Sequence, residues 1–229
     1  MANPGTVPLG GLVHAQLKDR VYAFLREAII AGEFPIGSAL RENDITARLG
    51  VSKTPVREAF VRLEKDRLLE LVPYKGAVVA GYTDDDLREF YEMRELVEGA
   101  CARMAALNCS DDFARRLQEN VDSSVSACEL SDDAMVVKLF EEFDALIYEQ
   151  STNRWIDDLV QNIDGHQRRI GRLTIDIPGR IQRSVGQHRA VAVAIGRRDA
   201  DGAEQHMRDH VRSVLEDQLD GEQRLSLPT

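Results

Sequence analysis

Apolar residues in the first third of the chain recur at helical spacing and change to a strand pattern only near residue 70. Val21, Leu25 and Ile29 fall on one face of a first helix, which we expect to stop at Gly32. Two short apolar runs on either side of residues 73–76 are typical of a β-hairpin. The elements predicted here are helices at about 15–31, 43–49 and 54–67 and strands at 68–72 and 77–80.

The turn between the second and third helices carries the strongest chemical signal. Gly50 suits the end of a helix, Thr54 is expected to be the N-cap of the next one, and Pro55 suits its first position. The polar residues left on the turn and the exposed first helical turn are Ser52, Lys53, Thr54 and Arg57. Hydroxyl groups and cations at a helix N-terminus suit phosphate binding and entry into the DNA major groove. The pattern therefore predicts a DNA-binding helix-turn-helix; the alternative is a merely capped and solvated surface helix.

After Gly81 the helical pattern continues without further strand signals. Helices are predicted near residues 84–107, 110–128, 132–150, 154–172, 179–197 and 200–218. The expected fold class is mainly α, with an N-terminal winged helix-turn-helix that has a small β-hairpin wing, followed by an all-α bundle of about six helices. The predicted divisions are a flexible arm at 1–13, a winged-helix domain at 14–81, a helical domain at 82–218 and a flexible tail at 219–229.

Charge is divided unevenly between these two parts. The 229-residue chain has a net charge of −10, yet residues 1–80 carry 11 basic and 9 acidic residues. The first part is therefore not repelled by DNA, whereas the strongly acidic second part would avoid it. No apolar run approaches 18 residues and no signal-peptide pattern is seen, so we expect a soluble cytoplasmic protein. The three cysteines form no C-x-x-C pair and suit reduced thiols.

The stretches GEFPIGSALRE (residues 32–42) and GVSKTPVREAFVRL (residues 50–63) resemble the winged helix of GntR-type bacterial repressors, in particular the FadR branch. The resemblance implies DNA contacts from Ser52, Lys53, Thr54 and Arg57 and wing contacts near Lys75 and Gly76. A contact position that is frequently Arg in the family is Asn43 here, so Arg41 beside it is the expected phosphate contact. Residues 83–217 are similar for the most part to the FadR-type effector domain.

Arg94 falls in the centre of an apolar stripe formed by Leu87, Val97 and Cys101. A buried guanidinium is costly unless it is paired. One interpretation is a structural ion pair with Glu98, one helical turn further on. The other is an anchor that binds a carboxylate ligand in bidentate fashion. The sequence leaves both open.

Two histidines, His188 and His210, lie on apolar stripes and are expected to face the interior of the bundle. In many relatives these two positions join an Asp and a further His around a divalent metal such as zinc, nickel or manganese. The earlier pair reads Phe140 and Asp144 here. The candidate metal ligands, and effector ligands together with Arg94, are therefore Asp144, His188 and His210. Without a metal, the same residues would line a polar pocket.

The sequence as a whole predicts a ligand-responsive transcriptional regulator that acts as a repressor, and not an enzyme. It would bind a double-stranded inverted-repeat operator as a homodimer, respond to a small metabolite such as a carboxylate, and need no membrane. One alternative is a metal-dependent hydrolase that uses His188, His210 and Asp144. A second is a DNA-binding protein that has no effector and uses its helical part only to dimerise.

Overall fold

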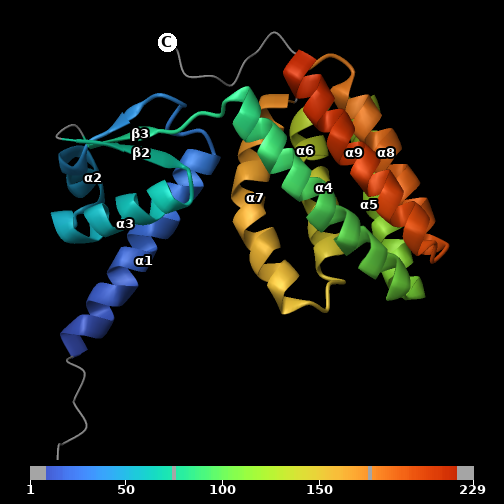
Figure 1. The fold of residues 1–229 in the computed structure, drawn as a ribbon, viewed down its shortest axis with the longest axis horizontal. Helices are drawn as coiled ribbons and strands as arrows, with labels where there is room; N and C mark the ends of the chain where they lie inside the picture. Colours follow the sequence, from blue (N-terminus) through green and yellow to red (C-terminus); the bar gives the residue numbers. More distant parts are fainter. Residues whose placement is uncertain (1–8, 74–75, 175–176, 221–229) are drawn as a thin grey trace, which may run out of the picture. The chain divides into compact units, whose positions relative to one another are not determined.

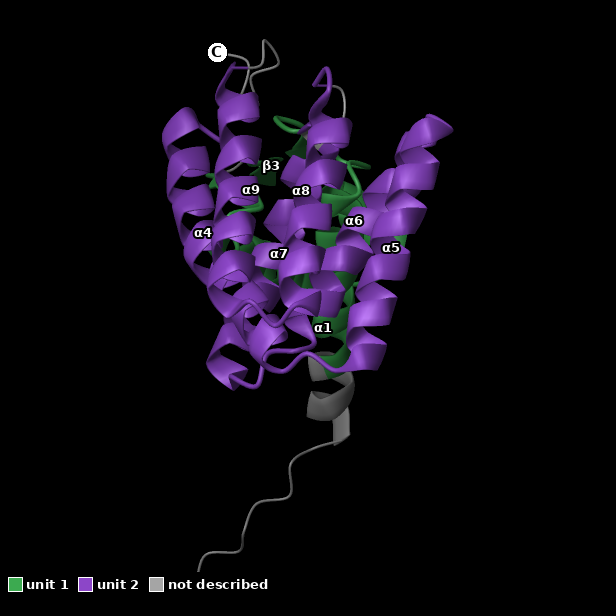
Figure 2. Ribbon diagram, turned by 90° about the vertical axis from the view of Figure 1, so that its right-hand side faces the viewer, with its two compact units in different colours: residues 1–81, 226–229 green, residues 82–225 purple. Residues whose placement is uncertain are grey.

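The computed structural model of the chain describes residues 9–73, 76–174 and 177–220 (Figure 1). The chain divides into two compact units, and the boundary between them lies between Gly81 and Tyr82 (Figure 2). Each unit has its own cluster of buried apolar residues. No helix among the described residues is long and apolar enough to cross a membrane.

Unit 1 combines a helix-turn-helix with a small sheet. Its described elements are α1 (Leu9–Ile30), β1 (Ala39–Leu40), α2 (Glu42–Leu49), α3 (Lys53–Lys65), β2 (Leu69–Val72) and β3 (Gly76–Val79). Helix α3 packs against α1, α2 and β2. Leu25, Ile29, Phe60 and Leu63 meet in the core beneath them, and they are almost fully buried. The predicted helix-turn-helix is confirmed.

The three strands form an antiparallel sheet in the order β1-β3-β2. Strands β2 and β3 form the predicted hairpin, with Val72 opposite Gly76, while β1 adds Leu40 opposite Ala77. Strand β1 was not predicted, because two residues are too short to show an alternating pattern. Gly76 has φ +100°, and a Cβ there would lie 2.5 Å from the Leu40 carbonyl oxygen, so this close approach requires glycine.

Two predictions about helix starts are wrong. Helix α1 begins at Leu9 and not near residue 15, so it occupies part of the expected arm; residues 1–8 of that arm lie outside the described residues. Helix α3 has Ser52 as its N-cap, which places Pro55 at the third helical position and not the first. Both errors have the same cause. The first backbone N–H groups of a helix have no partner within it, so the first turn tolerates glycines, and also a proline, which has no N–H to lose.

Unit 2 is the expected bundle of about six helices. The described helices are α4 (Asp84–Leu107), α5 (Asp111–Glu129), α6 (Asp133–Tyr148), α7 (Arg154–Thr174), α8 (Arg180–Gly196) and α9 (Ala200–Asp220). Helix α9 lies alongside α4 and α8, α5 packs on α6 and α8, and α7 contacts α6 and α4 (Figures 1 and 2). Buried side chains such as Tyr91, Phe143 and Ile170 fill the interior. Residues 221–229, most of the predicted tail, lie outside the described residues.

Candidate DNA-binding surface and effector cavity

The start of α3 presents the polar residues that the sequence singles out. Ser52, Lys53 and Thr54 are exposed around the first turn of the helix. Arg57 follows one turn later, and 63% of its side chain is exposed. The opposite face of the same helix is buried through Val56 and Phe60. Packing of that apolar face therefore fixes the polar face toward solvent.

Arg41, Lys53, Arg57 and Gly76 line one open groove, although they come from the start of α2, from α3 and from the wing hairpin. The groove brings together four of the seven residues predicted to contact DNA. Ser52 and Thr54 lie beside it on the same helical turn. Lys75, the seventh, lies outside the described residues.

Glu42 is the residue in this groove that the sequence did not indicate. Its two carboxylate oxygens each accept a hydrogen bond from Arg57 Nε at 2.8 Å. The two residues are 15 positions apart, on different helices, so no sequence pattern predicts the pair. Glu42 holds the arginine at the edge of the groove and offsets its charge in the free protein.

Unit 2 contains a cavity of about 150 Å³ among its helices. Its walls come from α4, α6, α7, α8 and α9. All four predicted effector-binding residues line it: Arg94, Asp144, His188 and His210. The described chain thus brings these residues to one site, whatever ligand that site takes.

Arg94 forms the ion pair that was one of the two interpretations. Its Nε and Nη2 donate to the two carboxylate oxygens of Glu98, at 2.6 and 3.3 Å, and both side chains are buried. A bidentate pair of this kind already supplies the partner that a buried guanidinium needs. The pairing with Glu98 accounts for the buried guanidinium, and Arg94 as an anchor for a carboxylate ligand stays a prediction.

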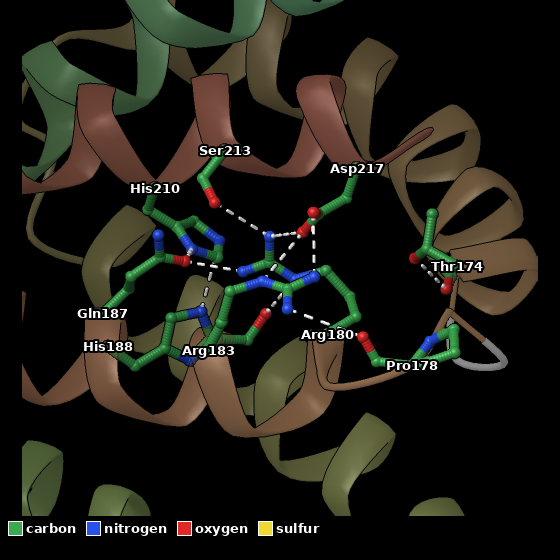
Figure 3. A network of polar contacts seen from close by, with 11 residues as sticks. Thr174, Pro178, Arg180, Arg183, Gln187, His188, His210, Ser213 and Asp217 are labelled. Carbon is green, nitrogen blue, oxygen red and sulfur yellow. Dashed lines mark hydrogen bonds and ion pairs between the residues drawn. The ribbon is translucent and has the colours of Figure 1, made fainter. Parts of the chain in front are cut away.

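Arg180 organises the wall formed by α8 and α9 (Figure 3). This buried guanidinium donates to Ser184 and Ser213, to the Asp217 carboxylate at 2.5 Å and to Gln187 Oε1 at 2.6 Å. Gln187 Oε1 also lies 2.9 Å from His210 Nδ1. His210 Nε2 is in turn 3.4 Å from His188 Nε2. A chain of polar contacts therefore runs from Asp217 to His188.

The chemistry of the donors fixes the protons in this chain. A guanidinium can only donate, so the Gln187 atom it meets is an acceptor, and His210 Nδ1 must carry a hydrogen. Neutral His210 then has a lone pair at Nε2, toward which His188 Nε2 donates. The remaining nitrogen, His188 Nδ1, is left as an acceptor, and it is buried with no hydrogen-bond partner among the described residues.

Both histidines are held neutral by their surroundings. Burial, with the positive charge of Arg180, lowers the pKa of His188 to about 3. Burial also lowers the pKa of His210 well below its ordinary value, with smaller contributions from His188 and Arg180. The His188 ring stacks on Phe143 with centroids 4.2 Å apart and meets the edge of Phe140 at 4.6 Å. Two aromatic rings in close contact with the histidine favour the uncharged imidazole.

Asp144 stands on the α6 side of the cavity. One of its oxygens accepts a hydrogen bond of 2.6 Å from Gln167 Nε2, and Gln167 Oε1 accepts from the Tyr148 hydroxyl at 3.2 Å. Burial, together with the negative charge of Glu98, raises the pKa of Asp144 well above its ordinary value. This side of the cavity therefore favours a protonated acid over a carboxylate.

Asp144, His188 and His210 share the cavity but do not form the predicted metal site. Within the described ranges, no three His, Cys, Asp or Glu side chains are grouped so as to hold a metal ion. His188 and His210 face each other, but Asp144 bonds to Gln167, and Phe140 occupies the position at which the family resemblance implies an Asp ligand. The donor set is two imidazoles beside a guanidinium, which does not fit a resident metal.

Sequence reasoning also missed Arg180 and Gln187, which connect the two histidines to Asp217. Arg180 is the first residue of α8, a place where an arginine is ordinarily solvated, and its acid partner lies 37 positions away. Only the packing of α8 against α9 reveals that it is buried.

Comparison with known proteins identifies both units. The family described as FCD domain matches residues 89–213, and the family described as bacterial regulatory proteins, gntR family, matches residues 17–79. The transcriptional repressor RspR of Escherichia coli K12 is 25% identical over 200 residues, which cover 87% of this chain and 88% of RspR. The gluconate operon transcriptional repressor of Bacillus subtilis is 38% identical over 91 residues, or 40% of this chain and 37% of that protein. A crystal structure of a GntR transcriptional regulator from Rhodococcus sp. RHA1 superimposes with a TM-score of 0.71 at 26% identity, covering 87% of this chain and 95% of that one.

A winged helix joined to a helical ligand-binding domain defines the class of DNA-binding transcriptional regulators that respond to an effector. The chain belongs to the GntR family of bacterial regulatory proteins, in the branch that carries an FCD effector domain. The resemblance noted in the sequence is confirmed. The members of this family that match the chain are named as transcription regulators and repressors.

Proposed function

We propose that the protein is a repressor that binds an inverted-repeat operator as a homodimer in the cytoplasm. The observation that supports this most directly is the groove of unit 1, in which Arg41, Lys53 and Arg57 surround the exposed start of α3. A helix N-terminus enters the major groove most readily, and a two-fold dimer would place two such helices on successive half-sites.

Residues of the groove divide into two roles on this proposal. Arg57 would read a base edge, since arginine pairs in bidentate fashion with guanine. Ser52, Thr54, Lys53 and Arg41 would hold the phosphates, and Gly76 would let the wing backbone approach the DNA. Lys75, at the tip of the wing, is proposed as a further phosphate contact on its sequence position alone.

The effector would occupy the cavity of unit 2 and change the affinity for DNA. Couplings of this kind typically amount to about 1–3 kcal/mol, or about 5- to 150-fold in affinity. The alternative of a metal-dependent hydrolase has no support in the geometry, because its three ligands are not grouped among the described residues. The alternative without an effector leaves a cavity lined by buried polar groups unexplained.

Arg57→Ala tests the DNA-binding proposal. The operator is first obtained by selection from a random library with the wild-type protein, and affinity is then measured by fluorescence anisotropy. We expect Arg57→Ala to weaken operator binding by about 1–3 kcal/mol, or about 5- to 150-fold, which is the value of a bidentate base contact.

Arg62→Ala is the matched control, because Arg62 lies on the same helix but bonds to Asp19 of α1, away from the groove. It should leave operator affinity nearly unchanged. Equal affinities for wild type and Arg57→Ala, with both folded, would refute the assigned role of Arg57.

A further inference from the structure

The cavity of unit 2 offers hydrogen bonds, and its three less exposed arginines are paired with acids, while a fourth lining arginine, Arg172, is exposed to solvent. Arg94 is paired with Glu98, Arg180 with Asp217, and Arg168 with Glu141 and Asp164. At Arg94, Arg168 or Arg180, a carboxylate ligand would therefore have to displace an existing acid or be buried without a counter-charge. Burying an unpaired charge is far more costly than burying a neutral group that forms hydrogen bonds.

One acceptor that the cavity wall leaves without a hydrogen-bond donor is on a histidine; the Tyr91 hydroxyl and Glu141 Oε1 also lack a hydrogen-bond partner among the described residues. The contacts of Arg180 and Gln187 fix His210 as a donor toward Gln187, and this leaves His188 Nδ1 as a buried acceptor with no partner among the described residues. Such an atom loses a hydrogen bond on folding unless a water molecule or a ligand in the cavity brings an O–H or N–H group to it. A carboxylate ion carries no such donor.

The same wall opposes a metal ion. The Phe140 ring lies against His188, where a carboxylate would be needed to complete a ligand set, and the Arg180 guanidinium is bonded to the residue that orients His210. A divalent cation placed between the two imidazoles would meet a guanidinium and aromatic rings, and no carboxylate among the described residues is grouped with the imidazoles to offset its charge.

Size and apolar walls complete the description of the ligand. A cavity of about 150 Å³ can hold a molecule of the size of benzene. Phe140, Ile181 and Val214 supply apolar surface, while Tyr91 and Tyr148 add hydroxyl groups. The site thus resembles a pocket for a compact apolar body that has a polar end.

We infer that this cavity takes an uncharged ligand with a hydrogen-bond donor, of about the size of a substituted benzene ring, and that it does so without a metal ion. The inference rests on the proposed function in one respect only, namely that the cavity of unit 2 is the effector site. The effector class is then a phenol-like or alcohol-like molecule and not the carboxylate that the sequence suggested.

Three probes of similar size separate the possibilities: phenol, which is neutral and has a donor; toluene, which is neutral and has none; and benzoate, which is an anion. Binding to the full-length protein without DNA is measured at pH 7 by calorimetry or ligand-observed NMR. We expect phenol to bind about fivefold or more tighter than toluene, the ratio for one recovered hydrogen bond, and benzoate to bind weakest. Benzoate binding as tightly as phenol, toluene equalling phenol, or binding by none of the three would each overturn the inference.

His188→Phe keeps an aromatic ring in the stack and removes the acceptor. The variant should therefore still bind toluene but lose the preference for phenol over toluene. If this variant does not fold, the ratios measured with the wild-type protein still decide the question. Asp217→Asn removes the acid that is paired with Arg180, so on this inference it should strengthen the binding of benzoate while the preference for phenol over toluene remains.

The metal part is tested on the same protein after chelation and dialysis. Incubation with Zn²⁺, Ni²⁺ or Mn²⁺ followed by elemental analysis should leave far less than one ion per chain. The double variant Phe140→Asp/Asp144→His restores the pair expected in relatives and is the positive control for the assay. Stoichiometric metal in the wild type, lost on His188→Phe, would overturn the inference.

These outcomes are separate from those of the proposed function. If phenol binds as expected but no ligand affects operator binding, the inference about the cavity stands and the effector-responsive function fails. If a metal-bound carboxylate releases the operator, the function stands and the inference fails.

Discussion

At the scale of single residues, the three cysteines differ clearly in how far their thiols are buried. Cys101 is fully buried in α4, and burial raises the pKa of its thiol to about 12. Cys109 is buried as well, while Cys128 is only half-buried near the end of α5. Thiol reagents attack the thiolate, so both access and pKa protect Cys101.

We therefore expect Ellman's reagent to modify native Cys128 at least about tenfold faster than Cys101 at pH 8, as followed by mass mapping. The Cys128→Ser variant should lose the fast phase and keep the rest. Equal rates for Cys101 and Cys128 in the folded protein would contradict the burial described for α4.

The sequence predicted the residues of the site better than their contacts. His188 and His210 were expected to face the interior because apolar neighbours repeat around them, and both are buried. The Arg94–Glu98 pair could be proposed since it lies one helical turn apart. Glu42 and Arg180 could not, because each has its partner on another helix, and such contacts follow from packing and not from local spacing.

At the scale of elements, two helix ends were predictable because a single clear local signal marks each of them. Gly50 ends α2 in the left-handed conformation with φ 64°, as expected from its position. Thr83 accepts from the Asp86 backbone N–H while the Asp86 carboxylate accepts from that of Thr83, which gives a complete capping box. The predicted start of α3 was wrong because Thr54 and Pro55, which follow the true N-cap Ser52, look equally suitable for the start of a helix.

The Thr83 cap gives a prediction about stability. Thr83→Ala should destabilise unit 2 by about 1 kcal/mol, because the Asp86 backbone N–H loses its acceptor and the capping box at the start of α4 is no longer complete. Thr83→Ser retains the hydroxyl and should change stability by only a few tenths of a kcal/mol. Urea unfolding followed by circular dichroism measures both, and equal midpoints for Thr83→Ala and wild type would refute the role of the cap.

The wing hairpin gives a second prediction at this scale. Gly76→Ala introduces a Cβ that would meet the Leu40 carbonyl oxygen at 2.5 Å, at a φ of +100° that side chains rarely adopt. We expect a loss of about 1–3 kcal/mol in the stability of unit 1. Gly186→Ala is the matched control: its Cβ in α8 would meet nothing within 4 Å, so the change should be neutral or stabilise by up to about 1 kcal/mol.

Considered as a whole, the described residues form separate apolar cores in the two units: one cluster in unit 1, and a main cluster with a smaller one in unit 2. Two independent cores allow two cooperative transitions in place of one. We expect differential scanning calorimetry to resolve two unfolding steps. Gly76→Ala should lower the midpoint of only one step, and Thr83→Ala that of only the other. A single step that both variants shift equally would show that the units unfold together.

The pair of Glu42 and Arg57 has a consequence for how the proposed regulator would search a genome. Almost every stretch of DNA it meets is a wrong one, and attraction to phosphates alone would hold it there. Water screens an exposed ion pair, so the pair contributes less free energy than a bidentate contact between arginine and guanine. A guanine edge can therefore take Arg57 from Glu42, whereas a lone phosphate gains little by doing so. The Glu42 carboxylate would thereby shorten the residence time of the protein on non-operator DNA and leave its residence time on the operator long.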